Sequence, residues 1–366
     1  MIRRLPGIVP PHLLRELARN GTRAERDLAL RTLATDQASR GTREIAELGN
    51  PEEDRALARS VLVRKRRTIY DGGGQETLPG TIMRNEGSQP GSDSAANEAY
   101  EGLGATWDFY HAVYQRNSID DAGLPLDATV HYGQRYDNAF WDGHQMVFGD
   151  GDGKYFNRFT VAVDVIGHEL THGVTGHEAK LKYFGQPGAL NESISDVFGS
   201  LVKQFTLRQT ATQADWLIGA GLFTSRVKAD SGRPAALRSM GAPGTAYHDP
   251  VLGRDPQPGT MARFVHTSED NGGVHLNSGI PNRAFFLVAT KLGGHAWEHA
   301  GRIWYETLRD RELRPTTSFL GFAFRTVLAA TRLYGGTSRE CQAVLEAWRQ
   351  VGVMLPDART PSSAAA

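Results

Sequence analysis

The spacing of apolar residues predicts helices over much of the chain. Near the N-terminus the pattern predicts a helix over residues 12–33 that is interrupted at Asn20 and Gly21. A second helix is predicted at 95–115, where aromatic residues recur at helical spacing. Beyond residue 190 the pattern is almost wholly helical, with helices predicted at 193–208, 278–292, 297–309, 316–334 and 337–350.

Alternating apolar and polar residues predict strands between these helices. Residues 128–148 alternate in this way, and the run from Asp71 to Gly74 is a turn signal typical of a β-hairpin. Residues 149–153 resemble a calcium or phosphate loop, but no Gly-Lys-Ser/Thr follows, so we interpret them as a tight turn. Residues 34–67 are polar and predict a linker. The predicted order is therefore a basic segment, a strand-rich half and a helix-rich half.

Composition narrows the class of protein. The 366 residues include 41 Lys+Arg and 41 Asp+Glu, and 40% are hydrophobic, which is typical of a soluble globular protein. A single core stops growing near ~250–300 residues, so two domains are expected. No run approaches ~18 apolar residues, and the charge is balanced, so we expect neither a membrane nor a nucleic-acid partner. The basic run 64–67 could bind nucleic acid, but nothing nearby supports it. Cys341 is the single cysteine and excludes an intramolecular disulfide.

Charge is distributed unevenly along the chain. Residues 1–67 hold 15 Lys+Arg and 9 Asp+Glu, a net charge of +6, so the remainder carries −6. We expect the basic segment to dock on the acidic body. The apolar stretch 5–9 is too short for a signal peptide, so the compartment is open between the cytoplasm and export by a non-general route. The sequence has no oligomer signal, and we expect a monomer.

The strongest chemical motif is His168-Glu169-Leu170-Thr171-His172, inside the apolar run 159–174. Residues i and i+4 share a helix face, so both imidazoles could reach one Zn²⁺ at about 2.0–2.1 Å. Glu169 lies beside such an ion and could take a proton from a water molecule there. Two histidines and a glutamate are costly to bury in an apolar helix without a function.

A catalytic zinc needs a third protein ligand, and two residues are candidates. Glu178 follows His172 by six residues, a spacing used after a glycine turn, but Thr175 occupies the glycine position. Glu192 and Asp196 are spaced i, i+4 on a predicted helix. One could bind the metal while the other accepts the free ring N–H of a ligand histidine, and on this geometry we favour Glu192.

Together these motifs make the chain similar to the thermolysin family of zinc metallopeptidases over residues 68–355. The run 188–196, Gly-Ala-Leu-Asn-Glu-Ser-Ile-Ser-Asp, follows the first motif by about twenty residues, as in that family. The resemblance implies an α+β fold of two lobes, 68–180 with a curved sheet and 181–355 mainly helical, with the first motif's helix on the cleft floor. It implies one catalytic zinc whose three ligands are His168, His172 and Glu192. It also implies that Glu169 is the general base and that Asp196 is the hydrogen-bond partner of a ligand histidine.

The resemblance extends to residues that would bind substrate. Asn138-Ala139-Phe140-Trp141 resembles the family's edge strand, in which Asn138 and Ala139 pair with an extended peptide. Tyr183 and His275 correspond to the pair that stabilises the transition state, with Asp270 orienting His275. The family's carbonyl-gripping arginine corresponds to Arg238. The pocket for the residue after the scissile bond corresponds to Phe156, Phe159, Val165, Ile218 and Leu237, which implies a preference for bulky hydrophobic residues.

The N-terminal residues are similar to the short propeptide of protealysin-like members. This resemblance rests on the run 7–14, Gly-Ile-Val-Pro-Pro-His-Leu-Leu, and on the later Asn20-Gly21. We expect a propeptide at 1–50, with the cut point as late as residue 67. Our hypothesis is that it is an intramolecular inhibitor of a zymogen, with four residues in the cleft, Pro10, Pro11, His12 and Leu13.

The chain departs from the family at its double calcium site, which uses five acidic side chains. Three corresponding positions hold Lys203, Leu217 and Ala220, while Asp164 and Asp215 remain. We expect Lys203 to pair with these aspartates in place of an ion, so this calcium site is predicted to be lost. Calcium elsewhere is left open.

Two other functions are alternatives to a neutral zinc endopeptidase that acts on peptides and proteins. A zinc aminopeptidase would need an acidic anchor for the substrate amine, and no such motif is present. A binding protein with a structural zinc would not need Glu169 and would favour four protein ligands.

Overall fold

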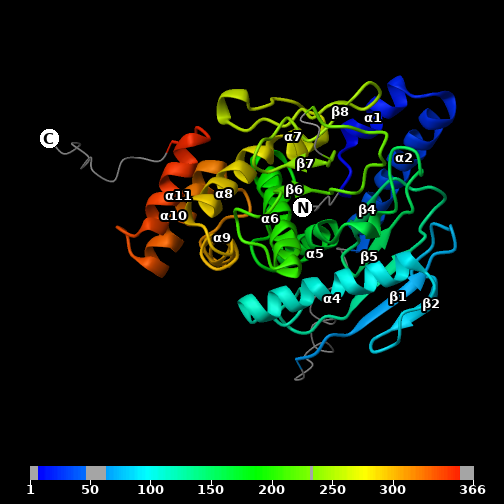
Figure 1. The fold of residues 1–366 in the computed structure, drawn as a ribbon, viewed down its shortest axis with the longest axis horizontal. Coiled ribbons are helices and arrows are strands. Elements are labelled where there is room, and N and C mark those ends of the chain that lie inside the picture. Colours follow the sequence, from blue (N-terminus) through cyan, green and yellow to red (C-terminus); the bar gives the residue numbers. More distant parts are fainter. Residues whose placement is uncertain (1–6, 47–62, 231–233, 355–366) are drawn as a thin grey trace.

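The computed structural model describes residues 7–46, 63–230 and 234–354, with the backbone alone at 38–46 (Figure 1). The strands are β1 (Arg67–Asp71), β2 (Thr81–Asn85), β3 (Leu126–Val130), β4 (Ala139–Trp141), β5 (Gln145–Phe148), β6 (Leu217–Ile218), β7 (Arg238–Ser239), β8 (His248–Asp249) and β9 (Gly253–Arg254). The helices are α1 (Pro11–Asn20), α2 (Arg23–Ala46), α4 (Ser94–Tyr114), α5 (Val163–His177), α6 (Gly185–Leu207), α7 (Asp270–Asn277), α8 (Gly279–Leu292), α9 (Ala300–Leu308), α10 (Phe319–Tyr334) and α11 (Arg339–Gln350).

A five-stranded mixed sheet dominates the N-terminal lobe, in the order β2-β1-β3-β5-β4. The pairs β1–β3 and β3–β5 are parallel, and β1–β2 and β4–β5 are antiparallel. The hairpin predicted at the glycine turn is confirmed, because β1 and β2 flank it. Strand β4 pairs with β5 alone among the described strands, so it lies at the edge of the sheet.

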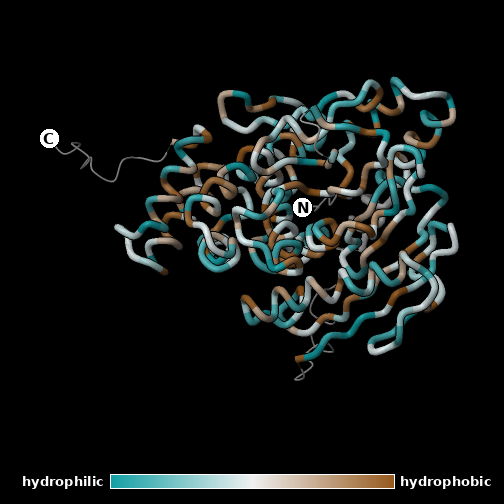
Figure 2. Tube along the Cα trace, viewed as in Figure 1, coloured by the Kyte–Doolittle hydropathy of each residue, from teal (hydrophilic) through white to brown (hydrophobic). Residues whose placement is uncertain are grey.

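The predicted α+β fold with two lobes is confirmed. The lobe that carries the sheet is followed by a helical lobe from α6 to α11, and α5 lies between them (Figure 1). Hydrophobic segments run through the interior of both lobes (Figure 2). Among the described helices, none is long and apolar enough to cross a membrane.

Glycines allow α5 and α6 to pack closely. A Cβ at Gly167 would lie 3.1 Å from the Cα of Gly199, and a Cβ at Gly199 would lie 2.4 Å from the carbonyl oxygen of Asp164. Only glycine permits such a backbone approach without displacement. This close contact sets the helix that carries His168 against the helix that carries Glu192.

Two predicted boundaries were wrong. Helix α2 continues to Ala46, through part of the region expected to be a linker, and α6 begins at Gly185 rather than at 193. Residues 34–46 contain helix-favouring alanine, arginine and glutamate, and side-chain contacts hold α2 on the body at Asp36. Most of the predicted cleavage region, 47–62, lies outside the described residues, and the domain boundaries stay predictions.

Candidate active site

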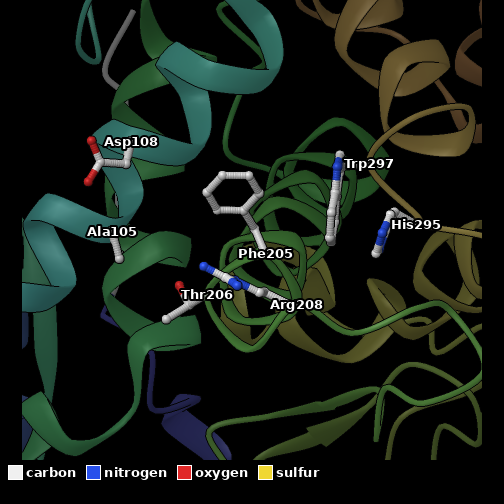
Figure 3. Close-up of a pocket in the computed structure, with 7 residues that line it drawn as sticks. All are labelled: Ala105, Asp108, Phe205, Thr206, Arg208, His295 and Trp297. Carbon is white, nitrogen blue, oxygen red and sulfur yellow. The ribbon is translucent and has the colours of Figure 1, made fainter.

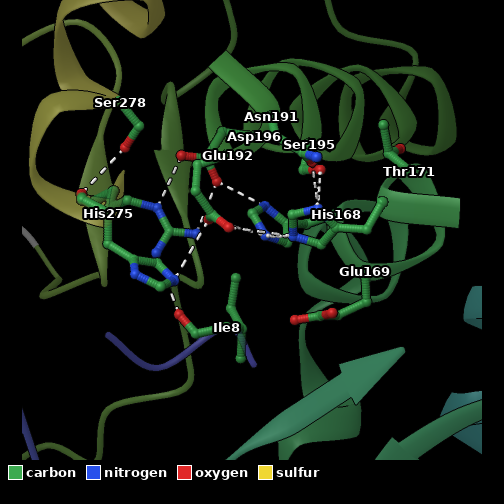
Figure 4. A network of polar contacts seen from close by, with 12 residues as sticks. Ile8, His168, Glu169, Thr171, Asn191, Glu192, Ser195, Asp196, His275 and Ser278 are labelled. Atoms are coloured by element: carbon green, nitrogen blue, oxygen red, sulfur yellow. Dashed lines mark hydrogen bonds and ion pairs between the residues drawn. The ribbon is translucent and has the colours of Figure 1, made fainter. Parts of the chain in front are cut away.

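The three predicted metal ligands meet at one point, between α5 and α6. The Nε2 atoms of His168 and His172 are 3.0 Å apart. One oxygen of Glu192 lies 3.5 Å from the first Nε2, and the other lies 3.4 Å from the second (Figure 4). All three residues are buried, and their ligand atoms lie within 4.8 Å of one another. In the described part of the chain they are the group found to be suited to a metal ion.

The hydrogen bonds around this group fit a bound cation. The Nδ1 atoms of His168 and His172 donate to Asp196 Oδ1 and Asn191 Oδ1, both at 2.8 Å. The protons are therefore on Nδ1, and two Nε2 lone pairs face each other beside a carboxylate. Burial lowers the pKa of both histidines to about 4, which keeps them neutral. Oε2 of Glu192 accepts no hydrogen bond from a described residue. A metal ion would satisfy all of these atoms.

The alternative third ligand is engaged elsewhere. Glu178 forms an ion pair with the buried guanidinium of Arg116 and is not part of the group formed by His168, His172 and Glu192. The structure therefore favours Glu192 over Glu178, as predicted.

Glu169 faces the edge strand from α5. Its side chain is fully buried, and Oε2 accepts a hydrogen bond of 3.1 Å from the backbone N–H of Trp141 in β4. The carboxylate that we predicted as the base thus lies between the imidazoles of His168 and His172 and the strand predicted to bind substrate.

Tyr183 and His275 lie side by side next to Glu192. The Tyr183 hydroxyl donates to Glu192, and it is 3.5 Å from Nε2 of His275. Asp270 accepts from Nδ1 of His275 at 2.6 Å and from its backbone N–H at 2.9 Å. Burial lowers the pKa of His275, but the charges of Asp270 and Glu192 outweigh burial and raise it. The imidazole can therefore point a proton at a neighbouring oxygen.

Arg238 is joined to the metal-ligand group through Asp196. Its Nε and Nη2 atoms donate to the two oxygens of Asp196, each at 2.8 Å, and one of these oxygens also accepts from His168. Burial alone would raise the pKa of Asp196, but Arg238 and His168 hold it below its usual value. Both ionic side chains are almost completely buried.

The backbone of the N-terminal segment occupies the groups predicted to bind substrate. Ile8 donates its N–H to the carbonyl oxygen of Ala139 at 3.0 Å, and its own carbonyl accepts from Nη1 of Arg238 at 3.2 Å. The N–H of Val9 donates to Oδ1 of Asn138 at 2.9 Å. The segment thus pairs with β4 as an added strand would. Figure 4 shows Ile8 as part of this polar network.

These contacts lie earlier in the segment than we predicted. Pro10 precedes α1, and Pro11 and Leu13 are buried in its first turn. His12 points to the helical lobe, where its Nε2 is 3.1 Å from the hydroxyl of Tyr247. The residues that bond to Arg238 and the edge strand are therefore Ile8 and Val9.

The two helices of the N-terminal segment contact different lobes. Helix α1 contacts residues 247–269 of the helical lobe through three side chains, His12 to Tyr247, Arg15 to Glu269 and Asn20 to the carbonyl of Val251. Helix α2 contacts the sheet lobe through four others, Glu25 to Lys154, Thr32 to the backbone N–H of Asp137, Thr35 to Glu76, and Asp36 to Tyr136 and Asn138. Ile8, Val9 and Asp36 were not among the predicted site residues, because no local pattern marks a residue that bonds across more than 100 positions.

The apolar residues predicted to form a specificity pocket are all buried. The rings of Phe156 and Phe159 stack with centroids 5.9 Å apart. Ile218 pairs with Arg238 between β6 and β7, and the backbone N–H of Leu237 donates to Ile218. Val165 lies on α5. Ile218 and Leu237 thus lie next to Arg238, and the role of all five residues in specificity stays a prediction.

A separate pocket of about 450 Å³ lies at the other end of α6 (Figure 3). Its lining residues are Ala105, Asp108, Phe205, Thr206, Arg208, His295 and Trp297. Phe205 lies thirteen positions beyond Glu192 on the helix, which corresponds to roughly 20 Å. This pocket contains none of the predicted site residues.

Lys203 pairs with both aspartates, as its sequence suggested, and the loss of a calcium site here stays a prediction. Its Nζ lies 2.9 Å from both oxygens of Asp215, 3.5 Å from Asp164 and 3.2 Å from the carbonyl of Leu217. Burial raises the pKa of Asp164, and Lys203 opposes that shift. The ammonium group thus supplies the positive charge that the two aspartates require.

We expect Lys203→Met to lower the free energy of unfolding by about 3 kcal/mol, because it leaves the buried Asp164 without its cation. Denaturant unfolding of the full chain measures this loss. Lys291→Met is the control, since it breaks an exposed ion pair with Glu346 and should change little. A rise in the melting temperature of the unmodified chain with added Ca²⁺ that Asp215→Asn abolishes would contradict the assignment of this position to Lys203.

Comparison with known proteins agrees with this geometry. Residues 35–176 match the family described as thermolysin metallopeptidase, catalytic domain, and residues 179–353 match its alpha-helical domain. An "Extracellular metalloprotease" of Pectobacterium carotovorum subsp. carotovorum is 52% identical over 346 residues, 94% of this chain and 96% of the relative. "Protease PrtS" of Photorhabdus sp. (strain Az29) is 46% identical over 355 residues, 96% of this chain and 93% of the relative.

A solved structure aligns with nearly the whole chain. The precursor of protealysin, a metalloproteinase from Serratia proteamaculans, is 52% identical, with a TM-score of 0.85 over 95% of this chain and 99% of that one. The chain therefore belongs to the thermolysin family of metallopeptidases, as a protealysin-like member.

Proposed function

We propose that the chain is a zinc-dependent endopeptidase made as a zymogen, with its own N-terminal segment as the inhibitor. The observation that carries the proposal is the buried group of His168, His172 and Glu192, with Glu169 between it and an edge strand. The backbone of Ile8 already lies on that strand as a peptide would.

Two imidazoles and one carboxylate are a donor set typical of catalytic zinc, which leaves a position open for water or substrate. When bound, zinc would polarise the scissile carbonyl and favour ionisation of the attacking water. Asp196 and Asn191 fix the ring orientation of the two histidines through their Nδ1 protons.

The protein side chains would then divide the remaining work. Glu169 takes the proton of the attacking water and passes it to the leaving amine, since its carboxylate faces the edge strand. Tyr183 and His275 donate to the oxygen on which negative charge develops. Asn138 and Ala139 align the substrate backbone, and Arg238 binds one of its carbonyls. A bulky hydrophobic residue after the scissile bond would pack against the apolar positions near Phe156 and Leu237.

Latency follows from the same contacts. Ile8 and Val9 use Arg238, Ala139 and Asn138, so a substrate cannot bond to these groups while the segment is docked. We further propose that the enzyme acts outside the cell, in line with the name of the Pectobacterium relative.

Cleavage of an internally quenched peptide tests the proposal. We expect the processed enzyme to contain one zinc per chain, to cleave the peptide, and to lose that activity in phenanthroline and regain it with added Zn²⁺. The full chain before processing should be much less active. Folded, processed protein that lacks zinc or cleaves equally well after metal removal would refute the metallopeptidase assignment. Equal activity before and after processing would refute the inhibitory role alone.

Docking of α1 should weaken as the pH falls below about 6.5. Burial lowers the pKa of His12 to about 4, partly offset by Asp270 and reinforced by His275, Arg238 and Arg15. The undocked segment exposes this histidine with its ordinary pKa of 6.5, so proton uptake favours the undocked state. The docking equilibrium is constant above 6.5 and should weaken by about tenfold per pH unit between 6.5 and 4.

Hydrogen exchange in the full chain measures this dependence, in a Glu169→Gln background that prevents self-cleavage. Protection factors for residues 11–20 should fall below pH 6.5, while those of α4 stay constant. His12→Gln should abolish the fall between pH 6.5 and 4.5. Below 4.5 a second loss is expected, because Lys154 and Thr22 outweigh burial and hold the pKa of Glu25 at about 2 when docked. An unchanged pH profile in His12→Gln would rule out the histidine.

A further inference from the structure

We infer that Asn282 is a positioning residue for the reaction, acting through Asp196 on both the metal ligand His168 and the substrate-binding Arg238. This inference rests on the proposed function. Asn282 lies on α8, is completely buried, and donates from Nδ2 to Oδ2 of Asp196 at 2.8 Å.

Asp196 is hydrogen-bonded both to a proposed metal ligand and to the arginine proposed to bind substrate. Its Oδ1 accepts from Nδ1 of His168 and Nη2 of Arg238, and its Oδ2 accepts from Nε of Arg238 and Nδ2 of Asn282, all at 2.8 Å. A carboxylate has about four lone-pair sites, so these four bonds saturate it. They come from α5, β7 and α8, while Asp196 itself is on α6. Figure 4 shows the carboxylate facing His168.

Of the three donor residues, Asn282 is the one with no proposed part in metal or substrate binding. A carboxylate accepts and cannot donate, so only the NH₂ end of the amide can face it. The amide orientation is thus fixed. Its other end, Oδ1, accepts no hydrogen bond from a described residue. Burying that oxygen costs stability, so packing alone does not favour an amide at this position.

Loss of this bond should loosen both partners of Asp196 together. Without Asn282, Oδ2 retains only the bond from Nε of Arg238, and the carboxylate can rotate about its side-chain torsion. Rotation shifts Oδ1, which orients both His168 and Nη2 of Arg238. Changes to residues that orient metal ligands typically weaken metal binding by 10–100-fold. Because Asn282 acts one residue further away, we expect about a tenfold loss of zinc affinity and a similar rise in KM.

The test compares Asn282→Leu with a control of the same kind. Gln204 is also a buried amide, donates one hydrogen bond, to Ser200, and has an oxygen without a partner among the described residues. It lies two turns beyond Asp196 on α6, away from the metal ligands. Gln204→Leu should change the melting temperature without changing zinc affinity or KM.

Zinc affinity is measured on the full chain by competition with a chromophoric chelator, and KM and kcat on the processed enzyme with a quenched peptide. We expect Asn282→Leu to weaken zinc binding and raise KM together, with a smaller effect on kcat at saturating zinc. A change in melting temperature alone, or in kcat alone, would overturn the inference. Asn282→Ala provides the same test if the leucine variant does not fold. An unmodified enzyme that binds no zinc would instead refute the proposed function.

Discussion

Replacing Glu169 with glutamine is expected to reduce peptide cleavage by about 10²–10⁴-fold, the range that a positioned acid or base contributes. The amide keeps the shape of the side chain and its contact with the N–H of Trp141, which donates to Oε2. It cannot accept a proton from water. The processed variant should therefore be folded but nearly inactive, and the loss of activity should appear in kcat rather than in KM.

Two controls separate this role from a structural one. Zinc content should stay at one ion per chain, because the proposed ligands are His168, His172 and Glu192 and do not include Glu169. Glu178→Gln, which changes a glutamate paired with Arg116, should retain activity. If the Glu169 variant kept more than a tenth of the activity, another group would have to be the base.

The second large effect is expected at Tyr183 and His275. Removing one donor to a developing oxyanion typically costs ~2.7–4 kcal/mol of barrier, or about 10²–10³-fold in kcat. Tyr183→Phe and His275→Ala should each fall in this range. Their hydroxyl and Nε2 are only 3.5 Å apart and both contact Glu192, so they would act on one oxygen. The double variant should therefore lose less than the product of the two single losses.

Kinetics on a quenched peptide give these values, with KM expected to change little. Tyr114→Phe is the matched control, because its hydroxyl is partly buried on α4 and donates to the carbonyl of Trp297 instead. That variant should keep its kcat. Losses at Tyr183 and His275 that appear only in KM would assign these residues to ground-state binding.

Local sequence patterns were sufficient to predict the central part of the site. The i, i+4 spacings of His168 with His172 and of Glu192 with Asp196 place each pair on one helix face, because helical geometry brings residues four positions apart together. The resemblance to thermolysin added Tyr183, His275 and Arg238, which no local pattern distinguishes from ordinary packing or surface residues. The observed geometry brings all of them to one place.

Long-range contacts could not be predicted in the same way. The extension of α2 beyond residue 33 depends on tertiary contacts such as that between Asp36 and Asn138, separated by 102 positions. The same limit applies to Asn282, whose role depends on a carboxylate 86 positions away. The segment 7–9 contains little polar side-chain chemistry, and its contacts with Arg238 and Ala139 use backbone groups that every residue has.

The two helices of the N-terminal segment contact different lobes, and this determines what happens after the peptide chain is cut. Any break between residues 47 and 62 leaves every contact of α1 and α2 in place, because none of those contacts passes through the broken bond. Scission would convert the proposed intramolecular inhibitor into a separate fragment that still contacts both lobes. Its departure would then depend on dilution, since the tether no longer maintains a high effective concentration. Enzyme kept concentrated after processing should regain activity slowly, and diluted enzyme should regain it quickly.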